Sequence, residues 1–382
     1  MSTDSEEVLL HTAQQRQPVL AERLVAWQRA EGRHHLPWQQ TRDPYRVWLS
    51  EIMLQQTQVS TVLGYYARFL ERFPTVADLA AAPLDEVLAM WSGLGYYSRA
   101  RNLHRCAQAV VADHGGEFPG RAEVLQTLPG IGPSTAAAVA SFCFDERISI
   151  MDGNVKRVLA RVLGWEADLS VAAHERSLMR AAERVLPVQS ADMPSYTQGL
   201  MDLGATLCTP RKPACLTCPW SELCVARATG EPERLPVKTR KLKRGSREHW
   251  WLWLARPSSD GEQVWLEQLP ETGVWAGLWT LPLFDDEAAL SAWVGEPLAA
   301  AMEPQPRIKH VLTHLDWCLH PRRLVISAAQ ADALTTALQA RQADPAQRPS
   351  VVTEQGRWVA LSALSERTSV GLPAPVRKLL LP

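Results

Sequence analysis

Up to about residue 227 the chain repeats apolar side chains at helical spacing. Runs rich in Ala, Leu and Arg are separated by Pro or Gly, and strand-like alternation is scarce. The pattern predicts helices, the clearest of which are 75–82, 84–91, 98–113, 134–144 and 155–163. We therefore expect an all-α domain in this part of the chain.

The stretch SEIMLQQTQV, residues 50–59, places a carboxylate and three glutamines in an otherwise mostly apolar run. Read on a helical period, Glu51, Gln55 and Gln58 form one polar stripe. The other face is apolar, with Trp48, Ile52, Val59 and Leu63. A surface stripe on an amphipathic helix would explain this pattern. Glu51 alone therefore does not indicate a catalytic site, and a second carboxylate is needed to support one.

The pattern of apolar and polar residues changes after residue 227. Residues 228–247 are rich in Gly, Pro and positive charge and indicate a basic linker. Beyond it HWWLWLAR (249–256) and GEQVWLEQL (261–269) flank the turn PSSDG, which predicts a β-hairpin. Helical patterns return at 287–294 and 328–340. We expect a helical domain (1–227), the linker (228–247) and a smaller α+β domain (248–382).

Composition narrows the class of protein. The 382 residues are too many for one ordinary domain, and 46% hydrophobic with 21% charged residues describe a protein with ample core. The net charge of −1 does not by itself indicate a polyanionic partner. The N-terminus lacks a signal-peptide pattern, and no uncharged apolar stretch is long enough to span a bilayer. We expect a cytoplasmic monomer without a membrane partner.

Four of the seven cysteines lie within CTPRKPACLTCPWSELC. This C-x6-C-x2-C-x5-C spacing comprises Cys208, Cys215, Cys218 and Cys224. Such clustering indicates a soft-metal site rather than a secreted disulfide framework. The x6 and x5 gaps are awkward for a zinc ribbon, so the spacing favours an iron–sulfur cluster without excluding zinc. Cys106, Cys143 and Cys318 read as ordinary buried thiols.

The stretch LPGIGPSTAA (128–137) predicts a turn that leads into a helix. Gly130 and Gly132 permit a tight turn, and Pro133 suits the first position of the helix that follows. Exposed amides at such a helix start bind an anion, and a helix–hairpin–helix of this kind grips a DNA phosphate without reading sequence. A helical corner without a ligand would use the same residues.

Asp152 stands at the start of a further helix, in IMDGNVKRVLAR. Asp152 or Asn154 can cap that helix, and a capping carboxylate near the positive helix end remains ionised. Glu51 has an apolar neighbourhood, which raises a carboxyl pKa; a rise of roughly two units from about 4.3 makes a workable general acid. One neutral and one charged carboxyl is the pair that cleavage of a glycosidic bond requires.

Taken in order, these motifs and WSGLGYYSRARNL (91–103) resemble the adenine DNA glycosylases of the MutY type, densely over residues 20–227. The resemblance implies a helical glycosylase domain and a [4Fe–4S] cluster on the four cysteines. It implies duplex DNA as the partner, with adenine mispaired with 8-oxoguanine or guanine as the substrate. Among the catalytic residues, Glu51 matches the acid that protonates N7 and later activates water, Asp152 the carboxylate that stabilises the cation at C1′, and Asn154 a neighbour that holds the site.

The resemblance also implies residues that contact DNA. They lie in the glutamine run, the WSGLGYY turn and the hairpin: Gln55, Gln56, Leu94, Tyr96, Gly130, Gly132 and Ser134. Similar endonuclease III glycosylases carry a catalytic lysine at the position of Ser134, so we expect base removal without strand cleavage. Lys156 could still trap the sugar weakly.

The C-terminal part resembles a Nudix-like module, through VWAGLWTLP (274–282) and IKHVLTHLDW (308–317). The metal-binding R-E-x-x-E-E pattern of hydrolytic Nudix proteins is missing from DDEAALSAWVG, so we expect no pyrophosphatase activity. Where many relatives read Phe-Ser-His, this chain has Leu312, Thr313 and His314. Thr313 keeps a hydroxyl for the 8-oxoguanine edge, and the aromatic contact is lost.

Two other functions fit parts of the pattern. A thymine or oxidised-pyrimidine glycosylase could use the same scaffold, although the paired glutamines, Ser134 and the C-terminal domain disfavour it. A non-catalytic binder of damaged DNA would need the hairpin and the cluster but neither Glu51 nor Asp152.

Overall fold

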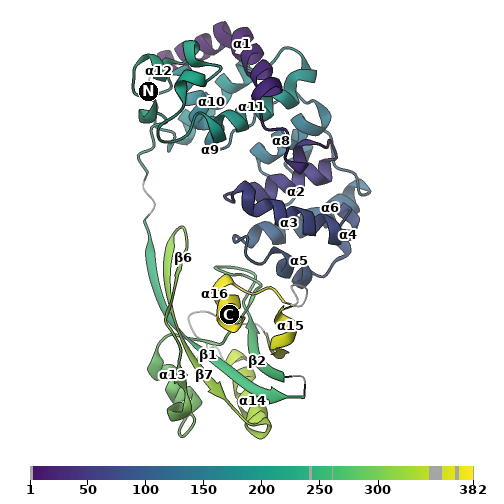
Figure 1. The fold of residues 1–382 in the computed structure, drawn as a ribbon, viewed down its shortest axis with the longest axis vertical. Coiled ribbons are helices and arrows are strands. Elements are labelled where there is room, and N and C mark those ends of the chain that lie inside the picture. The colour runs from purple at the N-terminus through teal and green to yellow at the C-terminus, as the bar shows by residue number, and fades with distance from the viewer. Residues whose placement is uncertain (1–2, 241–242, 260, 344–354, 366–369, 382) are drawn as a thin grey trace. The chain divides into compact units, whose positions relative to one another are not determined.

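The computed structural model describes residues 3–240, 243–259, 261–343, 355–365 and 370–381 (Figure 1). Its internal contacts divide the chain into two compact units. The first comprises residues 1–80 and 105–241, and the second comprises residues 81–104 and 242–382. The chain therefore leaves the first unit, enters the second, returns, and ends in the second.

The first unit is helical. Its longer helices are α1 (Thr3–Glu31), α2 (Pro44–Leu54), α3 (Val59–Arg72), α8 (Pro133–Phe144), α9 (Gly153–Leu163), α10 (Ala172–Arg184) and α11 (Met193–Thr206). Shorter turns are α7 (Ala122–Leu125) and α12 (Val225–Ala228), while α4 (Val76–Ala81) and α6 (Ser98–His114) cross the sequence boundaries of the unit. The predicted helices at 75–82, 98–113, 134–144 and 155–163 are confirmed within two residues at each end.

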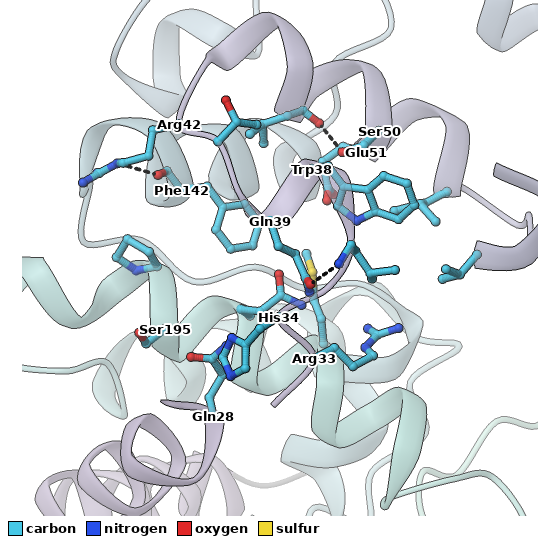
Figure 2. A pocket seen from close by; sticks show the side chains of 18 of the residues that line it. Gln28, Arg33, His34, Trp38, Gln39, Arg42, Ser50, Glu51, Phe142 and Ser195 are labelled. Carbon is cyan, nitrogen blue, oxygen red and sulfur yellow. Dashed lines mark hydrogen bonds between the residues drawn. The ribbon is translucent and has the colours of Figure 1, made fainter. Parts of the chain in front are cut away.

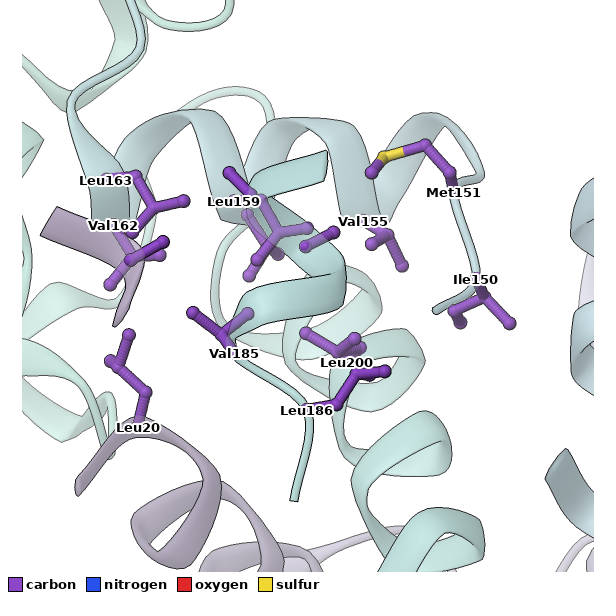
Figure 3. Close-up of a cluster of buried hydrophobic side chains, with 14 of the residues drawn as sticks. Leu20, Ile150, Met151, Val155, Leu159, Val162, Leu163, Val185, Leu186 and Leu200 are labelled. Carbon is purple, nitrogen blue, oxygen red and sulfur yellow. The ribbon is translucent and has the colours of Figure 1, made fainter. Parts of the chain in front are cut away.

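Helix α9 anchors the core of the first unit. Val155, Val158, Leu159 and Val162 recur at helical spacing and are at most 2% exposed. They join Leu20 of α1, Leu200 of α11 and other apolar side chains in one cluster (Figure 3). This packing fixes the start of α9, which carries Asp152 and Asn154.

The predicted polar stripe does not lie on one helix. Helix α2 ends at Leu54, and Gln58 is the residue before α3, so Gln55 and Gln58 flank a turn. Gln56 within it has φ +56, a left-handed conformation that non-glycine residues seldom adopt. The prediction was wrong because helical periodicity continued by chance across the break. Trp48 and Ile52 are buried as expected, whereas Leu63 is exposed.

The second unit contains a mixed sheet. Its strands are β1 (Gly245–Ser258), β2 (Gly261–Gln268), β3 (Trp279–Thr280), β4 (Leu283–Phe284), β5 (Glu303–Pro304), β6 (Ile308–Val311), β7 (Leu315–Val325) and β8 (Gln355–Ala360). The order β3-β2-β1-β7-β5 forms the central path, with β4, β6 and β8 paired to β1, β7 and β2. Strands β1 and β7 run parallel, with Gly245 opposite Leu315 and Ala255 opposite Val325.

The predicted hairpin is confirmed, because β1 and β2 pair antiparallel from Ala255 with Val264 to Ser258 with Gly261. Residue 260 of its turn lies outside the described residues. Helices α13 (Glu287–Val294) and α14 (Ala328–Ala343) also match the prediction, and α15 (Leu361–Ser365) and α16 (Ala374–Leu380) complete the unit. The expected fold class, a helical domain followed by a smaller α+β domain, is confirmed.

The units differ from the expected boundaries in two places. Residues 81–104, with helix α5 (Leu84–Trp91), belong to the second unit. Ser92 Oγ and Tyr97 Oη both donate to the carbonyl of Leu372, at 3.1 and 3.0 Å. In the expected linker 228–247, Leu235 is buried in the first unit and β1 begins at Gly245. Residues 241–242 of this segment lie outside the described residues.

Candidate active site

A pocket of about 420 Å³ opens in the first unit beside Glu51. Its walls come from the end of α1, the loop 33–42, helix α2 and helix α11. Figure 2 shows Glu51, Trp38, Gln39 and Arg33 around this space. A flat aromatic ring beside amide and guanidinium groups suits a flat, polar-edged ligand such as a nucleobase.

Glu51 lies on α2, on the wall of this pocket. Burial, and after it the negative charge of Asp152, raise the pKa of the Glu51 carboxyl to about 7. The predicted rise of the Glu51 pKa is confirmed. Because the charge of Asp152 contributes to this rise, the two residues lie close enough to interact electrostatically. At neutral pH a large fraction of Glu51 is therefore protonated and able to donate.

Asp152 caps α9 as predicted. Its Oδ1 accepts a hydrogen bond from the amide of Val155 at 2.7 Å. The amide of Met151, just before it, donates to Ser134 Oγ at 3.4 Å. Ser134, at the start of α8, thus holds the backbone that carries Asp152.

Asn154 connects the start of α9 to the cysteine loop. Its Oδ1 accepts from Arg157 at 2.9 Å, and Arg157 also donates to the carbonyls of Cys208 and Gly204, both at 2.8 Å. A Cβ on Gly204 would come within 2.8 Å of the Asn154 Cβ, so only glycine fits at that position without displacement. Asn154 is therefore tightly held by α11 and the loop.

The four predicted metal-binding cysteines line one small cavity of about 30 Å³. Burial raises the pKa of the thiols of Cys215, Cys218 and Cys224, and the neighbouring cysteines raise it further. Their ionisation therefore requires a compensating cation, which iron supplies. Among the described residues, no three Cys, His, Asp or Glu side chains converge as ligands of a single ion. A cluster does not require such convergence, because each thiolate binds its own iron.

Arginines surround the same cavity. Arg161, only 2% exposed, donates to the carbonyl of Thr209 at 2.7 Å and approaches Cys208 Sγ at 3.4 Å. Arg227 lines the cavity as well. These positive charges suit a negatively charged thiolate-bound cluster, so the donor set and its surroundings fit the cofactor.

The hairpin exposes the start of α8. Gly130, with φ +76, and Gly132 are both exposed, and a Cβ on Gly132 would meet no atom within 4 Å. Pro133 begins the helix as predicted. Nearby, Gln55 Nε2 donates to Thr135 Oγ1 at 3.3 Å, which ties the glutamine turn to this helix. The accessible helix start can receive a phosphate.

Apart from Gln56, which lies in the turn after α2, the remaining predicted residues meet around a second pocket, of about 650 Å³, within the second unit. Leu94, Tyr96, Thr313 and His314 all line it. Tyr96 Oη and Thr313 Oγ1 are hydrogen-bonded at 2.6 Å. Tyr96 is 45% exposed, with φ +48, while Leu94 is 6% exposed. The Tyr96 side chain is therefore exposed to solvent, whereas that of Leu94 is buried.

Several residues of the pocket beside Glu51 were not predicted from the sequence. Arg33, Trp38 and Gln198 line the pocket beside Glu51. Gln198 lies four residues before Asp202 on α11, and Asp202 is a fully buried carboxylate in the apolar run GLMDLGA. A charged residue in such a run was the available signal, since buried carboxylates require partners.

Models of three known families match separate parts of the chain. The HhH-GPD superfamily base excision DNA repair protein matches residues 49–187, and the iron-sulfur binding domain of endonuclease III matches residues 208–224. A NUDIX domain matches residues 252–381. Fold, pocket and cysteine loop together define a base excision DNA repair glycosylase that carries a [4Fe–4S] cluster.

Curated relatives identify the family. An adenine DNA glycosylase of Buchnera aphidicola subsp. Schizaphis graminum is 35% identical over 276 residues, 72% of this chain and 78% of the relative. That of Buchnera aphidicola subsp. Baizongia pistaciae is 30% identical over 364 residues, 95% of this chain and 96% of the relative. The chain belongs to the adenine DNA glycosylase family.

Among solved structures, a thermostable thymine-DNA glycosylase is similar with a TM-score of 0.51 and 29% identity. The match covers 56% of this chain and 98% of that one.

In the part of the chain that the structure describes, no helix is long and apolar enough to cross a membrane.

Proposed function

We propose that this enzyme removes adenine mispaired with 8-oxoguanine or guanine from duplex DNA and leaves the abasic site uncut. The observation that carries the proposal is Glu51, a carboxyl with a pKa of about 7 on the wall of a base-sized pocket and near the carboxylate of Asp152. Family membership supports adenine as the base, because the relatives are adenine DNA glycosylases.

Extrusion of the adenine from the duplex precedes the chemistry, since the glycosidic bond is unreachable within the stack. Protonated Glu51 donates to N7 of the extruded adenine, which makes the base a better leaving group. As the bond from N9 to C1′ breaks, positive charge develops on the sugar, and the side chain of Asp152 stabilises it. Glu51, now ionised, accepts a proton from the water that attacks C1′.

The supporting residues keep this pair in place. The amide of Val155 holds the Asp152 carboxylate, and the Ser134 hydroxyl holds the Met151 amide before it. Asn154 is fixed through Arg157. When bound, the iron–sulfur cluster would crosslink the 208–224 loop. Arg211 and Lys212 of this loop are exposed, so their side chains can approach phosphates.

The nucleophiles near the site support the proposal that the enzyme does not cleave the strand. Ser134 offers a hydroxyl where a lyase would offer an amine, and Lys156 is paired with Glu175 at 2.5 Å. A lysine amine held in an ion pair is a poor nucleophile. We therefore assign hydrolysis, not Schiff-base formation, to the wild-type enzyme.

The base opposite the adenine is assigned to the pocket of the second unit. The hydroxyl of Thr313 can bind an edge of 8-oxoguanine once Tyr96 enters the base stack. Thr313→Ala is expected to weaken the preference for 8-oxoguanine over guanine by roughly tenfold, the effect of one hydrogen bond of about 1.4 kcal/mol. Unchanged discrimination would assign the recognition of the opposite base to other residues.

One oligonucleotide assay tests the whole proposal. A labelled duplex with a single A·8-oxoguanine pair is incubated with the enzyme and divided into samples with and without hot alkali. Breakage only after alkali is the expected result. Breakage without alkali would identify a lyase, and retention of the duplex on the protein without any breakage would identify a binder.

A further inference from the structure

We propose that Asp202 sets the base specificity of the pocket by holding Gln198 with its amide oxygen toward the extruded base. This inference rests on the proposed function and adds a positioning residue that does not itself touch the substrate. Asp202 is 0% exposed and does not line the pocket, whereas Gln198 does.

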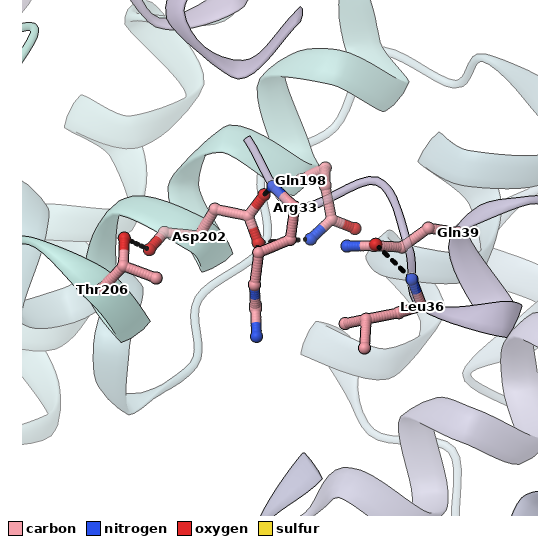
Figure 4. Close-up of polar contacts among 6 residues, drawn as sticks. All are labelled: Arg33, Leu36, Gln39, Gln198, Asp202 and Thr206. Atoms are coloured by element: carbon pink, nitrogen blue, oxygen red, sulfur yellow. Dashed lines mark hydrogen bonds and ion pairs between the residues drawn. The ribbon is translucent and has the colours of Figure 1, made fainter. Parts of the chain in front are cut away.

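The Asp202 carboxylate accepts three hydrogen bonds (Figure 4). Its Oδ1 accepts from Arg33 Nε at 2.7 Å and from Gln198 Nε2 at 2.8 Å. Its Oδ2 accepts from the backbone amide of Arg33 at 3.0 Å. Both Arg33 and Gln198 line the pocket, so one buried carboxylate orients two side chains on its wall.

Chemistry fixes the orientation of the Gln198 amide. A carboxylate paired with a guanidinium only accepts hydrogen bonds, so the amide must turn its NH₂ group toward Asp202. Figure 4 shows the amide nitrogen turned to Asp202 and the amide oxygen turned away from it. Because the two residues lie four apart on α11, this arrangement is built into one helix face.

The Gln198 amide oxygen that points away from Asp202 can accept a hydrogen bond. It is therefore complementary to the amino group at the 6-position of adenine. Adenine carries an amino donor at that position, whereas hypoxanthine and guanine carry an acceptor oxygen. An acceptor opposite an acceptor leaves two buried groups unpaired, which a hydrogen-bonding site rejects strongly. Asp202 thus discriminates for adenine indirectly.

The test uses the full-length enzyme with its cluster and compares two substrates. Single-turnover rates of base release are measured from duplexes that place adenine or hypoxanthine opposite 8-oxoguanine. Asp202→Asn introduces an NH₂ group that can donate to the Gln198 oxygen, so the Gln198 amide can rotate and present its own NH₂ group to the base. We expect the ratio of the adenine rate to the hypoxanthine rate to fall by about tenfold or more.

Two variants control the measurement. Thr206→Val removes a hydroxyl that donates to the backbone carbonyl of Asp202 at 2.8 Å, not to its carboxylate, and should keep the wild-type ratio. Asp202→Glu keeps an acceptor-only group and should also keep the ratio, even if both rates fall. Where Asp202→Asn does not fold, as judged by cluster absorbance and circular dichroism, the smaller Asp202→Ser replaces it, with the same expected fall.

The outcomes separate the two proposals. Equal loss of both rates in a folded Asp202→Asn enzyme would overturn the positioning role, because a purely structural defect does not change the ratio. A ratio that changes as much in Asp202→Glu would assign the effect to packing and overturn it as well. Failure of the wild type to release adenine would instead defeat the proposed function.

Discussion

At the scale of single residues, Glu51 is held in a state that is unfavourable for the fold and useful for the proposed reaction. Its carboxyl is largely desolvated on the wall of the pocket and feels the negative charge of Asp152, and both effects raise its pKa to about 7. No such arrangement is needed for stability, since a polar surface position would leave the carboxyl ionised and hydrated. The loss of stability from desolvating this carboxyl thus falls at the position where the proposed reaction requires a proton donor.

Replacing Glu51 with Gln should abolish base release while leaving DNA binding intact. Glutamine has nearly the same shape but donates no proton to N7, so the single-turnover rate should fall by about a hundredfold or more. Binding is measured with the same A·8-oxoguanine duplex. Ser50→Ala, next to it on α2, removes a hydroxyl that donates to the Val47 carbonyl and should retain the rate within a few fold. Normal turnover by the Glu51 variant would remove the proposed proton donor.

The same substitution should stabilise the protein, and more at high pH. The folded-state pKa of Glu51, about 7, lies above its ordinary value of 4.5, so between these values only the folded state holds the proton. The free energy of unfolding therefore falls as pH rises from about 4.5 to 7, by at most about 3.5 kcal/mol at roughly 1.4 kcal/mol per pH unit. Glu51→Gln removes this loss. Melting temperatures of both proteins at pH 5 and pH 8 check it, and an equal difference at both pH values would contradict the assigned pKa.

At the scale of helices and strands, much of the fold could be predicted because the elements carry strong local signals. Helix α5 was predicted at its exact residues, and α9 within two, since Gly164 ends it and Asp152 caps it. The break between α2 and α3 could not be read from the sequence, because Gln56 has no local feature that demands a left-handed φ. The walls of the pocket were also missed, since Arg33 and Gln198 converge only through tertiary packing.

The fit between α9 and α11 yields a prediction at this scale. Gly204→Ala would place a Cβ 2.8 Å from that of Asn154, too close without a shift of the start of α9. We expect a loss of stability of about 1–3 kcal/mol, as for other overpacked sites, together with slower base release. Gly64→Ala in α3 is the matched control, because its Cβ meets only the flexible end of Arg68 at 3.4 Å. That variant should gain about 0.5–1 kcal/mol in the free energy of unfolding. Equal effects of the two substitutions would contradict the close fit.

At the scale of the whole molecule, the units do not follow the order of the sequence. Residues 81–104 interrupt the first unit and belong to the second, where they form one wall of the pocket with Thr313. The sequence did not reveal this, because α5 has the composition of an ordinary helix and its partners lie more than 180 residues later. The helical part of the chain therefore depends on the C-terminal part for the burial of this segment.

A chain truncated after residue 241 should consequently not fold as a stable, isolated glycosylase domain, because residues 81–104 belong to the second unit. Leu88 and Trp91 are fully buried in the full chain, and a Cβ on Gly371 would come within 2.9 Å of that of Leu88, which shows how closely the two segments pack. Without residues 242–382 the apolar surface around Leu88 meets water, at about 25 cal/mol per Å². We expect the truncated chain to bind an apolar dye and to melt several degrees lower than the full chain, as followed by circular dichroism. Leu88→Gln should reduce dye binding in the truncated chain but destabilise the full one. A truncated chain that melts like the full protein and binds no dye would show that residues 81–104 are buried without the C-terminal unit.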